Sequence, residues 1–334
     1  MSNHRYIINL VSEINPEIWS RQISPDLALK LPNLHITHVP IWADLYIFYN
    51  TNGFYNVPNK AAQRVFYSSE PISLKRDSRL YLNQFDRILG SISSLFPDRD
   101  KFEVKIPASP WHIGINFENV YGKINLDFNK LSNLAAPYID EVSVITSSKN
   151  ISKTHQRRLL FIQELSKLLG AKIRIFGRGI NPIEDKYEVL GKYRYHLALE
   201  NTEQRDHWSE KLADPIMALN RVYYFGCSNI ENYFDPGSVL PIDIDDPVQV
   251  SRIILDEINN NYWGSSQELI KSSKIKIINE YNLISIISNL PINEINTEHK
   301  FPVYGDIFSW PRKIWRKFLW TIRKFIDSKG LGYN

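Results

Sequence analysis

The sequence is poor in the features that mark secreted and membrane-spanning proteins. It has a single cysteine, Cys227, in 334 residues, which excludes an internal disulfide framework and fits a reducing compartment. No apolar run approaches the roughly 20 residues that a bilayer-spanning helix needs. The first residues acquire charge too quickly for a secretory leader. We therefore expect an uncleaved, cytoplasmic protein.

An excess of charge of either sign is also missing from most of the chain, but the C-terminal segment is strongly basic. Residues 312–329 hold seven cations against Asp327 alone. On a helix, four apolar residues of this segment share one face: Ile314, Phe318, Ile322 and Phe325. This pattern favours a basic amphipathic helix on an anionic membrane surface, which would make the protein peripheral on the inner face of the membrane. The alternative is a helix packed on the body of the protein, and the slightly acidic body disfavours nucleic acid.

The N-terminal part of the chain mixes short β-like runs with one long helical candidate. The β-like runs cover residues 5–11, 45–50 and 64–69, and the helical candidate covers 78–96. The stretch 106–117 contains two prolines and a glycine, so it predicts irregular structure.

After about residue 141 the chain alternates strand-like and helical segments. Strands are predicted at 142–146, 171–177, 193–200 and 221–226, and helices at 153–170, at 186–192 and from about 209 onward. Such alternation predicts a parallel, doubly wound α/β sheet. Ligands of these sheets bind at the carboxyl ends of strands, against helix N-termini.

The length of the chain allows two domains with separate cores. We place the boundary near residues 138–141, where the regular alternation begins. The expected units are an N-terminal domain at 1–140, a C-terminal domain at 141–298 and the basic amphipathic tail at 299–334.

Polar side chains are dense between the predicted strand at 193–200 and the helix that follows. Ser209 is a candidate N-cap, and Glu210 and Lys211 would stand in the first turn. A lysine in a first turn opposes the helix dipole unless an anion is bound. Lys211 therefore indicates a phosphate ligand. The alternative, which the pattern favours equally, is that Glu210 and Lys211 are solvated side chains of the first turn.

Two further groups are predicted at the same edge of this sheet. Arg157 and Arg158 open the helix at 153–170, and a glycine turn, Gly177-Arg178-Gly179, follows the next strand. Each signal alone is weak, because first-turn arginines are commonly exposed and the turn lacks the GxGxxG spacing of a dinucleotide site. Together, cations that converge on one edge favour a nucleotide diphosphate.

The chain from about 142 to 246 resembles the α-1,3/1,4-fucosyltransferases, glycosyltransferase family 10. The matching motifs, in order, are Arg158 in "RLLFIQEL", "GRG", "KYRYHLALENT", "DHWSEKLADP", "YYFGCSNIENYF" and "PIDIDD". They cover roughly a third of the chain. In the N-terminal half, "RVFYSSEP", "LYLNQFDRILG" and "PWHIG" look like further family segments.

The resemblance implies the GT-B architecture, in which two Rossmann-like α/β domains face a cleft. GDP-fucose would lie on the C-terminal domain and the glycan acceptor on the N-terminal one. If the basic tail binds a membrane surface, the acceptor would be a lipopolysaccharide or another surface-glycan precursor. The implied reaction is an inverting, single-displacement transfer that has no obligatory metal or other cofactor besides the GDP-sugar donor.

The resemblance also assigns roles to individual residues. Glu70 would be the general base, Arg158 and Lys211 the pyrophosphate cations, and Glu210 the ribose-contacting carboxylate. The remaining donor-site residues would be Gly177, Arg178, Glu200, Asn201, His207 and Ser209. Without the resemblance, Glu70 would be read as an ordinary loop carboxylate before a proline.

Three positions depart from the family pattern. His207 stands where the family commonly has tyrosine, Tyr223 stands where it has proline, and Pro215 interrupts the helix after Lys211, with Asp214 as a second possible cap. These departures keep two alternatives open. One is the same fold with a different nucleotide sugar, and the other is a non-catalytic nucleotide-sugar-binding or membrane-associated protein.

A D-x-D motif, Asp243 to Asp245, is the pattern by which many metal-dependent glycosyltransferases hold a divalent cation. Three-residue acidic patterns are common by chance, and this motif falls in a family segment that holds no metal. We therefore expect no metal site.

Overall fold

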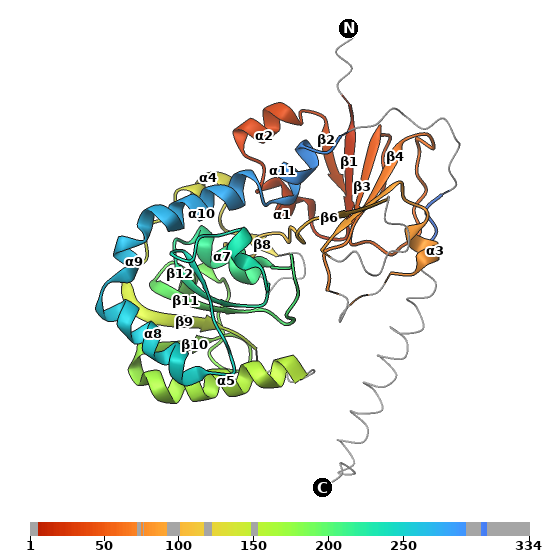
Figure 1. The fold of residues 1–334 in the computed structure, drawn as a ribbon. Helices are drawn as coiled ribbons and strands as arrows, with labels where there is room; N and C mark the ends of the chain where they lie inside the picture. Colours follow the sequence, from red (N-terminus) through yellow and green to blue (C-terminus); the bar gives the residue numbers. More distant parts are fainter. Residues whose placement is uncertain are drawn as a thin grey trace.

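The computed structural model describes residues 6–71, 75, 77–91, 101–116, 122–147, 153–291 and 302–305. Two α/β domains lie beside each other, each built on a parallel sheet (Figure 1). The predicted fold class, two doubly wound α/β domains, is confirmed. The predicted basic helix of the tail lies outside the described residues.

The first sheet has six parallel strands in the order β2-β1-β3-β4-β5-β6. The strands are β1 Ile8–Ser12, β2 Leu34–Thr37, β3 Leu45–Tyr49, β4 Gln63–Tyr67, β5 Arg87–Gly90 and β6 Phe102–Val104. The helices of this domain are α1 Pro16–Ser20, α2 Pro25–Lys30 and α3 Arg79–Leu82.

The central strands of the first sheet are buried on both faces. Every residue of β1, β3, β4 and β5 is buried. Alternate residues belong to different cores: Ile47 and Tyr67 pack with one, whereas Phe48 and Phe66 pack with the other. This division follows from the two-residue period of a strand, and burial on both faces explains why these segments read as continuous apolar runs.

The helix predicted for 78–96 is wrong over its described part. Only Arg79–Leu82 is helical, and the chain then turns into strand β5, which pairs with β4 and β6. Arg87 on β5 donates from Nε to Glu103 Oε1 on β6 at 2.7 Å. Pairing with two strands satisfies the backbone and buries the segment on both faces, and this overrides a local helical pattern.

The second sheet has five parallel strands in the order β10-β9-β11-β12-β13. The strands are β9 Ile139–Ile145, β10 Ile173–Phe176, β11 Tyr193–Leu199, β12 Arg221–Phe225 and β13 Val239–Pro241. The helices are α5 Lys153–Leu169, α6 Tyr187–Leu190, α7 Glu210–Met217, α8 Pro247–Asn259, α9 Tyr262–Ser265 and α10 Gln267–Asn279, with 3-10 turns η2 Gly170–Lys172 and η3 Ile230–Asn232. The predicted order of strands and helices in this half is confirmed.

Helix α7 differs from the sequence prediction in one respect. Ser209 is its N-cap, as expected, but the helix continues through Pro215 to Met217. Asp214 therefore caps nothing, and its fully buried carboxylate accepts hydrogen bonds from the backbone of His112 at 2.9 Å and from Lys186 Nζ at 2.6 Å. Burial of this helix and these long-range contacts outweigh the hydrogen bond that a proline removes.

The two sheets are connected through a segment without regular structure at 105–114. The irregular structure predicted for 106–117 is confirmed up to residue 114, whereas Ile115–Asn116 form strand β7. The domain boundary near 138–141 stays a prediction. A two-stranded hairpin and a short helix follow it: β7 Ile115–Asn116, β8 Lys123–Ile124 and α4 Phe128–Ser132. Near the end of the described chain, α10 leads to α11, Leu283–Ser288, which packs against α2 of the first domain (Figure 1). The chain thus crosses between the domains twice.

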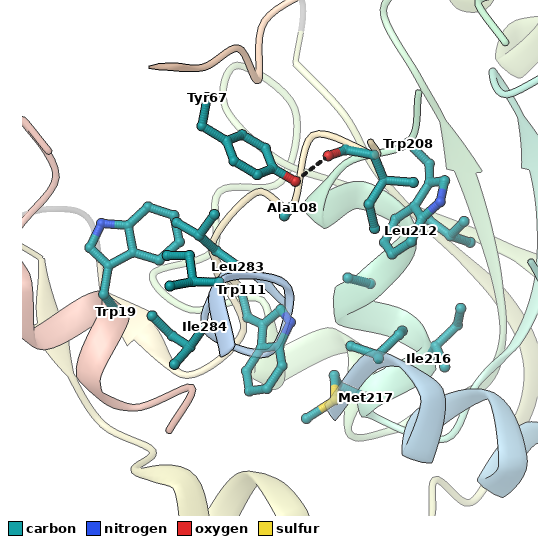
Figure 2. Close-up of a cluster of buried hydrophobic side chains, with 14 of the residues drawn as sticks. Trp19, Tyr67, Ala108, Trp111, Trp208, Leu212, Ile216, Met217, Leu283 and Ile284 are labelled. Atoms are coloured by element: carbon teal, nitrogen blue, oxygen red, sulfur yellow. Dashed lines mark hydrogen bonds between the residues drawn. The ribbon is translucent and has the colours of Figure 1, made fainter. Parts of the chain in front are cut away.

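One apolar cluster, here called the shared core, extends through both domains. Figure 2 shows part of it, with Trp19 and Tyr67 from the first domain, Trp111 from the connecting segment, Trp208, Leu212, Ile216 and Met217 from the second domain, and Leu283 and Ile284 from α11. The Tyr67 hydroxyl donates to the backbone carbonyl of Ile106 in the connecting segment at 2.7 Å. Burying each such side chain contributes roughly 1.5–3 kcal/mol, so the shared core couples the two domains.

Among the residues described here, no helix has the length and hydropathy to cross a membrane.

Candidate functional site

The predicted donor residues converge where the strand order of the second sheet reverses. In the order β10-β9-β11, the direction of chain progression changes between β9 and β11. Thr146 follows β9, and Glu200 and Asn201 follow β11. In doubly wound sheets, this place at the carboxyl ends of the strands is where ligands bind.

Arg158 reaches these strand ends from the second turn of α5. Its Nη1 donates to Asn201 Oδ1, and its Nη2 donates to Thr146 Oγ1 at 3.3 Å. Burial lowers the pKa of Arg158, and the nearby Glu200 carboxylate opposes this effect. The adjacent Arg157 is exposed and pairs with Asp245, Nη2 to Oδ2 at 2.6 Å. Of the two arginines, Arg158 is the one that is buried against these strand ends.

The Glu200 carboxylate is held under the first turn of α7. Its Oε1 accepts hydrogen bonds from the Ser209 backbone N at 2.8 Å and from Ser209 Oγ at 2.7 Å. A β-carbon at Gly226 would lie 2.4 Å from Glu200 Cγ, and Gly226 has a φ of +152°. The glycine of the "YYFG" motif is therefore required by the close approach of Glu200.

Glu210 and Lys211 form an ion pair at the start of α7. Lys211 Nζ lies 3.4 Å from Glu210 Oε1 and 3.4 Å from Glu200 Oε2. Burial favours the neutral form of Lys211, but the two carboxylates outweigh it and raise the pKa of Lys211 above its ordinary value. The first turn of this helix thus presents a fixed cation, as the sequence predicted.

Two further basic side chains lie beside Glu210, and the sequence pattern did not indicate either of them. His112 Nδ1 lies 3.8 Å and Lys186 Nζ 3.9 Å from Glu210 Oε1. Burial acts to raise the pKa of Glu210, but Lys211, His112 and Lys186 outweigh it and hold the pKa well below its usual range. Burial lowers the pKa of His112, against the attraction of Glu210. His112 lies in the "PWHIG" motif, which was the available signal, whereas Lys186 stood in no motif.

Glu70 lies on the first domain, three residues after the end of β4. The residue is exposed, yet its carboxyl group interacts electrostatically with Glu210 and Lys211 of the second domain. Partial desolvation of the carboxyl group by its surroundings raises the pKa of Glu70 first, Lys75 and Lys211 lower it, and Glu210 raises it. Glu70 therefore approaches the first turn of α7 from the other domain.

Tyr49, which the sequence prediction missed, interacts electrostatically with both Glu70 and Glu210. Its buried hydroxyl donates to the Pro107 carbonyl at 3.2 Å. Burial raises the pKa of Tyr49 well above its ordinary value, and Glu70 and Glu210 raise it further. No local sequence signal marked this tyrosine, because its role depends on the approach of two domains.

The glycine turn after β10 has a structural cause. A β-carbon at Gly177 would lie 1.7 Å from the Thr146 carbonyl oxygen, and Gly177 has a φ of +123°. The turn therefore packs against the end of β9, beside Arg158. Arg178 is exposed at this edge.

His207 contacts the first domain in this structure. Its Nδ1 lies 3.0 Å from Ser91 Oγ, and Gln204 Nε2 donates to the same oxygen at 2.8 Å. Burial lowers the pKa of His207, so the neutral imidazole is favoured. The predicted contact of His207 with the donor stays a prediction.

Among the described residues, no group of three or more His, Cys, Asp or Glu side chains is arranged to hold a metal ion. Within the D-x-D motif, Asp245 pairs with Arg157, and Asp243 Oδ1 accepts the Asp245 backbone N–H at 2.8 Å.

No family model and no curated protein matches the chain. Solved structures with a similar architecture include an α1,3-fucosyltransferase with GDP-fucose, at 17% identity over 84% of this chain and 94% of that chain, with a TM-score of 0.45. A second α1,3-fucosyltransferase structure gives 15% identity over 85% and 93% of the two chains, with a TM-score of 0.46. WaaG, a glycosyltransferase involved in lipopolysaccharide biosynthesis, gives 10% identity over 85% and 99%, with a TM-score of 0.44.

Proposed function

We propose that the protein is an inverting glycosyltransferase that transfers fucose from GDP-fucose to a hydroxyl group of a glycan acceptor. The observation that carries the proposal is the electrostatic interaction of Glu70, on the first domain, with Lys211 at the carboxyl edge of the second sheet. A carboxylate on one side and two cations on the other are what a single displacement with a diphosphate leaving group requires.

The donor would occupy the edge defined by Arg158 and Lys211. Asn201 and Thr146 orient the Arg158 guanidinium, and Glu200 and Glu210 hold the Lys211 ammonium. Both cations are thus preorganised for the pyrophosphate. The ionised Glu210 is available to accept hydrogen bonds from ribose hydroxyls.

In the proposed reaction, an acceptor hydroxyl oxygen attacks the anomeric carbon and its proton passes to the Glu70 carboxylate. The bond from the anomeric carbon to the GDP oxygen breaks, and GDP departs with the electron pair. Arg158 and Lys211 stabilise the charge that develops on the leaving group. A raised pKa makes Glu70 a stronger base than an ordinary carboxylate.

Glu70→Gln tests the proposal, because the amide keeps the shape of the side chain but accepts no proton. Transfer from GDP-fucose should fall about 100- to 10,000-fold, while GDP affinity measured by calorimetry should stay within about twofold of wild type. Glu164→Gln, on the exposed face of α5, is the matched control and should leave both quantities unchanged. Undiminished transfer by Glu70→Gln would contradict the assignment of the base.

Two alternatives have distinct outcomes. A different donor is favoured if another nucleotide sugar raises the melting temperature more than GDP-fucose does, since a ligand of the native state stabilises it. A non-catalytic binding protein is favoured if the unaltered protein binds a nucleotide sugar but transfers none. His207 departs from the family pattern and contacts Ser91, and this departure is the reason for testing other nucleotide sugars.

We also propose that residues 299–334 bring the protein to an anionic membrane surface, where a lipopolysaccharide or other surface-glycan precursor would be the acceptor. The support is the basic amphipathic sequence of the tail and the position of its first described residues. Val303 bridges to Tyr55 on the first domain, and the rings of Phe54 and Tyr304, both exposed, lie 5.7 Å apart beside this bridge. Exposed aromatic side chains next to a cationic segment are typical of interfacial binding.

Deletion of the residues after Pro311 tests the membrane proposal. The shortened protein should lose binding to vesicles that contain anionic phospholipid and should keep its activity on a soluble acceptor. Unchanged vesicle binding would refute the proposal. Loss of soluble activity would favour the alternative in which the tail packs on the body.

A further inference from the structure

Ser91 links the two domains beside the proposed site. It follows β5 of the first domain, and its Oγ lies within hydrogen-bond distance of two side chains of the second domain. Gln204 Nε2 donates to it at 2.8 Å, and His207 Nδ1 lies 3.0 Å away. The three residues are here called the interdomain clamp.

On the second domain, the loop that carries Gln204 and His207 is held in place by hydrogen bonds that do not involve Ser91. The Gln204 backbone N donates to the Gly226 carbonyl at 3.0 Å. Asp206 adopts a left-handed conformation, with a φ of +56°, and exchanges two hydrogen bonds with Asn229, while its Oδ1 also accepts from the Tyr233 hydroxyl at 2.7 Å. A strained residue held by three hydrogen bonds indicates a loop whose shape is set by its surroundings.

The side of the clamp on the first domain is joined to the strand that carries Glu70. Ser68 N donates to the Leu89 carbonyl at 2.8 Å, which ties the end of β4 to β5. A β-carbon at Gly90 would lie only 3.2 Å from Ser68 Cβ. Ser91 and Glu70 therefore follow two adjacent, closely packed strands, one residue and three residues beyond their ends.

The hydrogen bonds of the clamp agree with a neutral histidine. The Gln204 amide nitrogen Nε2 can only donate, so the Ser91 hydroxyl oxygen accepts the hydrogen bond from Gln204. The hydroxyl proton of Ser91 is then available to be donated to His207 Nδ1. This places the imidazole proton on Nε2. Burial, which lowers the pKa of His207, favours the same neutral form.

We infer that Ser91, Gln204 and His207 form a clamp that fixes the position of Glu70 relative to the donor edge, and that His207 acts on transfer through Ser91 and not as a donor ligand. The inference rests on the proposed function. His207 is two residues from Ser209, which holds Glu200, so the clamp connects the donor edge directly to the strand ends of the first domain. A misplacement of about 1 Å between reacting groups can cost about 100-fold in rate.

Kinetics separate a positioning role from donor binding. Ser91→Ala and His207→Phe should each lower kcat about 10- to 100-fold and leave the Kd for GDP within about twofold of wild type. His207→Asn keeps an acceptor near the position of Nδ1 and should retain kcat within about threefold. If His207→Phe instead raises the Kd for GDP and leaves kcat at saturating donor unchanged, His207 is a donor ligand and the inference is overturned.

A second measurement does not depend on activity. The melting temperatures of Ser91→Ala, His207→Phe and the double variant form a cycle. If the two side chains share one contact, the double variant should melt no lower than the less stable single variant. Additive losses would overturn the clamp. Absence of transfer by the unaltered protein would refute the proposed function, and this cycle would still decide whether the clamp exists.

Discussion

At the scale of single residues, adjacent side chains of the same type have different environments because the fold places them differently. Arg157 and Arg158 are neighbours on α5, yet Arg157 is exposed and paired with Asp245, whereas Arg158 is buried against Asn201 and Thr146. Their sequence context is the same, so only the direction of each side chain separates them.

Replacing these arginines gives a matched pair of variants. Arg158→Met should raise the Kd for GDP about 10- to 100-fold, the loss expected when a hydrogen bond to a charged group is removed. Arg157→Met should change it less than about twofold, since exposed ion pairs contribute little. Calorimetric titration with GDP measures both. Equal losses in the two variants would contradict the assignment of Arg158 to the donor site.

The depressed pKa of Glu210 predicts a pH dependence of stability. A carboxyl group whose pKa is lowered on folding stabilises the native state above its unfolded pKa, near 4.5, and this stabilisation is lost as the pH falls toward the folded value. Glu210→Gln should therefore be less stable than wild type at pH 7, and the difference should shrink between pH 4.5 and 3. Urea unfolding of both proteins at pH 4.5 and at pH 3 measures the effect. A difference in unfolding free energy between wild type and variant that is independent of pH would contradict the prediction.

At the scale of elements, the segment at 105–114 is held by side chains from both domains in place of regular structure. Arg21 at the end of α1 donates hydrogen bonds to four backbone carbonyls, those of Trp111, Ile113, Gly114 and Leu126. From the second domain, Asp214 accepts the N–H of His112, and Asp185 accepts that of Gly114 at 2.8 Å. Buried backbone groups must find partners, and here side chains supply them.

Arg21 is therefore expected to be important for stability. Its pKa is lowered to about 10, chiefly by burial, so the guanidinium stays charged at neutral pH. Arg21→Met should reduce the free energy of unfolding by about 3 kcal/mol or more, because it leaves several buried carbonyls without partners. Arg174→Met, at an exposed pair with Glu141, should cost about 0.5 kcal/mol or less. Chemical denaturation compares the two, and similar losses would contradict the role of Arg21.

The predictions of helices and strands are correct where the local sequence pattern and the tertiary contacts favour the same conformation. Helix α5 has its apolar residues at helical spacing, and Ser209 caps α7 because its side-chain oxygen accepts the Lys211 backbone N–H. The prediction failed at β5, where pairing with two strands determines the conformation, and at Pro215, where burial retains a helix that the proline should interrupt. Short strands buried on both faces carry no alternating pattern, so sequence cannot distinguish them from helix.

At the scale of the whole molecule, the shared core makes the two domains depend on each other for stability. It contains Trp19 from the first domain and Trp208 from the second, and the fully buried Ile284 of α11 packs into it (Figure 2). The domains also have separate apolar clusters, on the outer side of each sheet. The structure is therefore a pair of domains with one common centre.

We expect the chain to unfold in a single transition. Tryptophan fluorescence and far-ultraviolet circular dichroism should give the same midpoint in urea. Ile284→Ala should lower the free energy of unfolding by about 2–5 kcal/mol, the cost of a large cavity in a core. Leu160→Ala, at an exposed position of α5, should have little effect. Two separate transitions, only one of which responds to Ile284→Ala, would contradict the shared core.

The sequence by itself determined the class of the fold and the order of elements in the second domain, because these follow from local periodicity and capping. The candidate carboxylates and cations came from the resemblance to a family of known motifs. Only the tertiary structure decided that Arg158 and not Arg157 is buried against Asn201 and Thr146, that His112 and Lys186 lie beside Glu210, and that His207 contacts Ser91, which lies 116 residues away in the chain. Such contacts depend on how strand ends of two domains are brought together by a shared apolar core, and no short stretch of sequence records that arrangement.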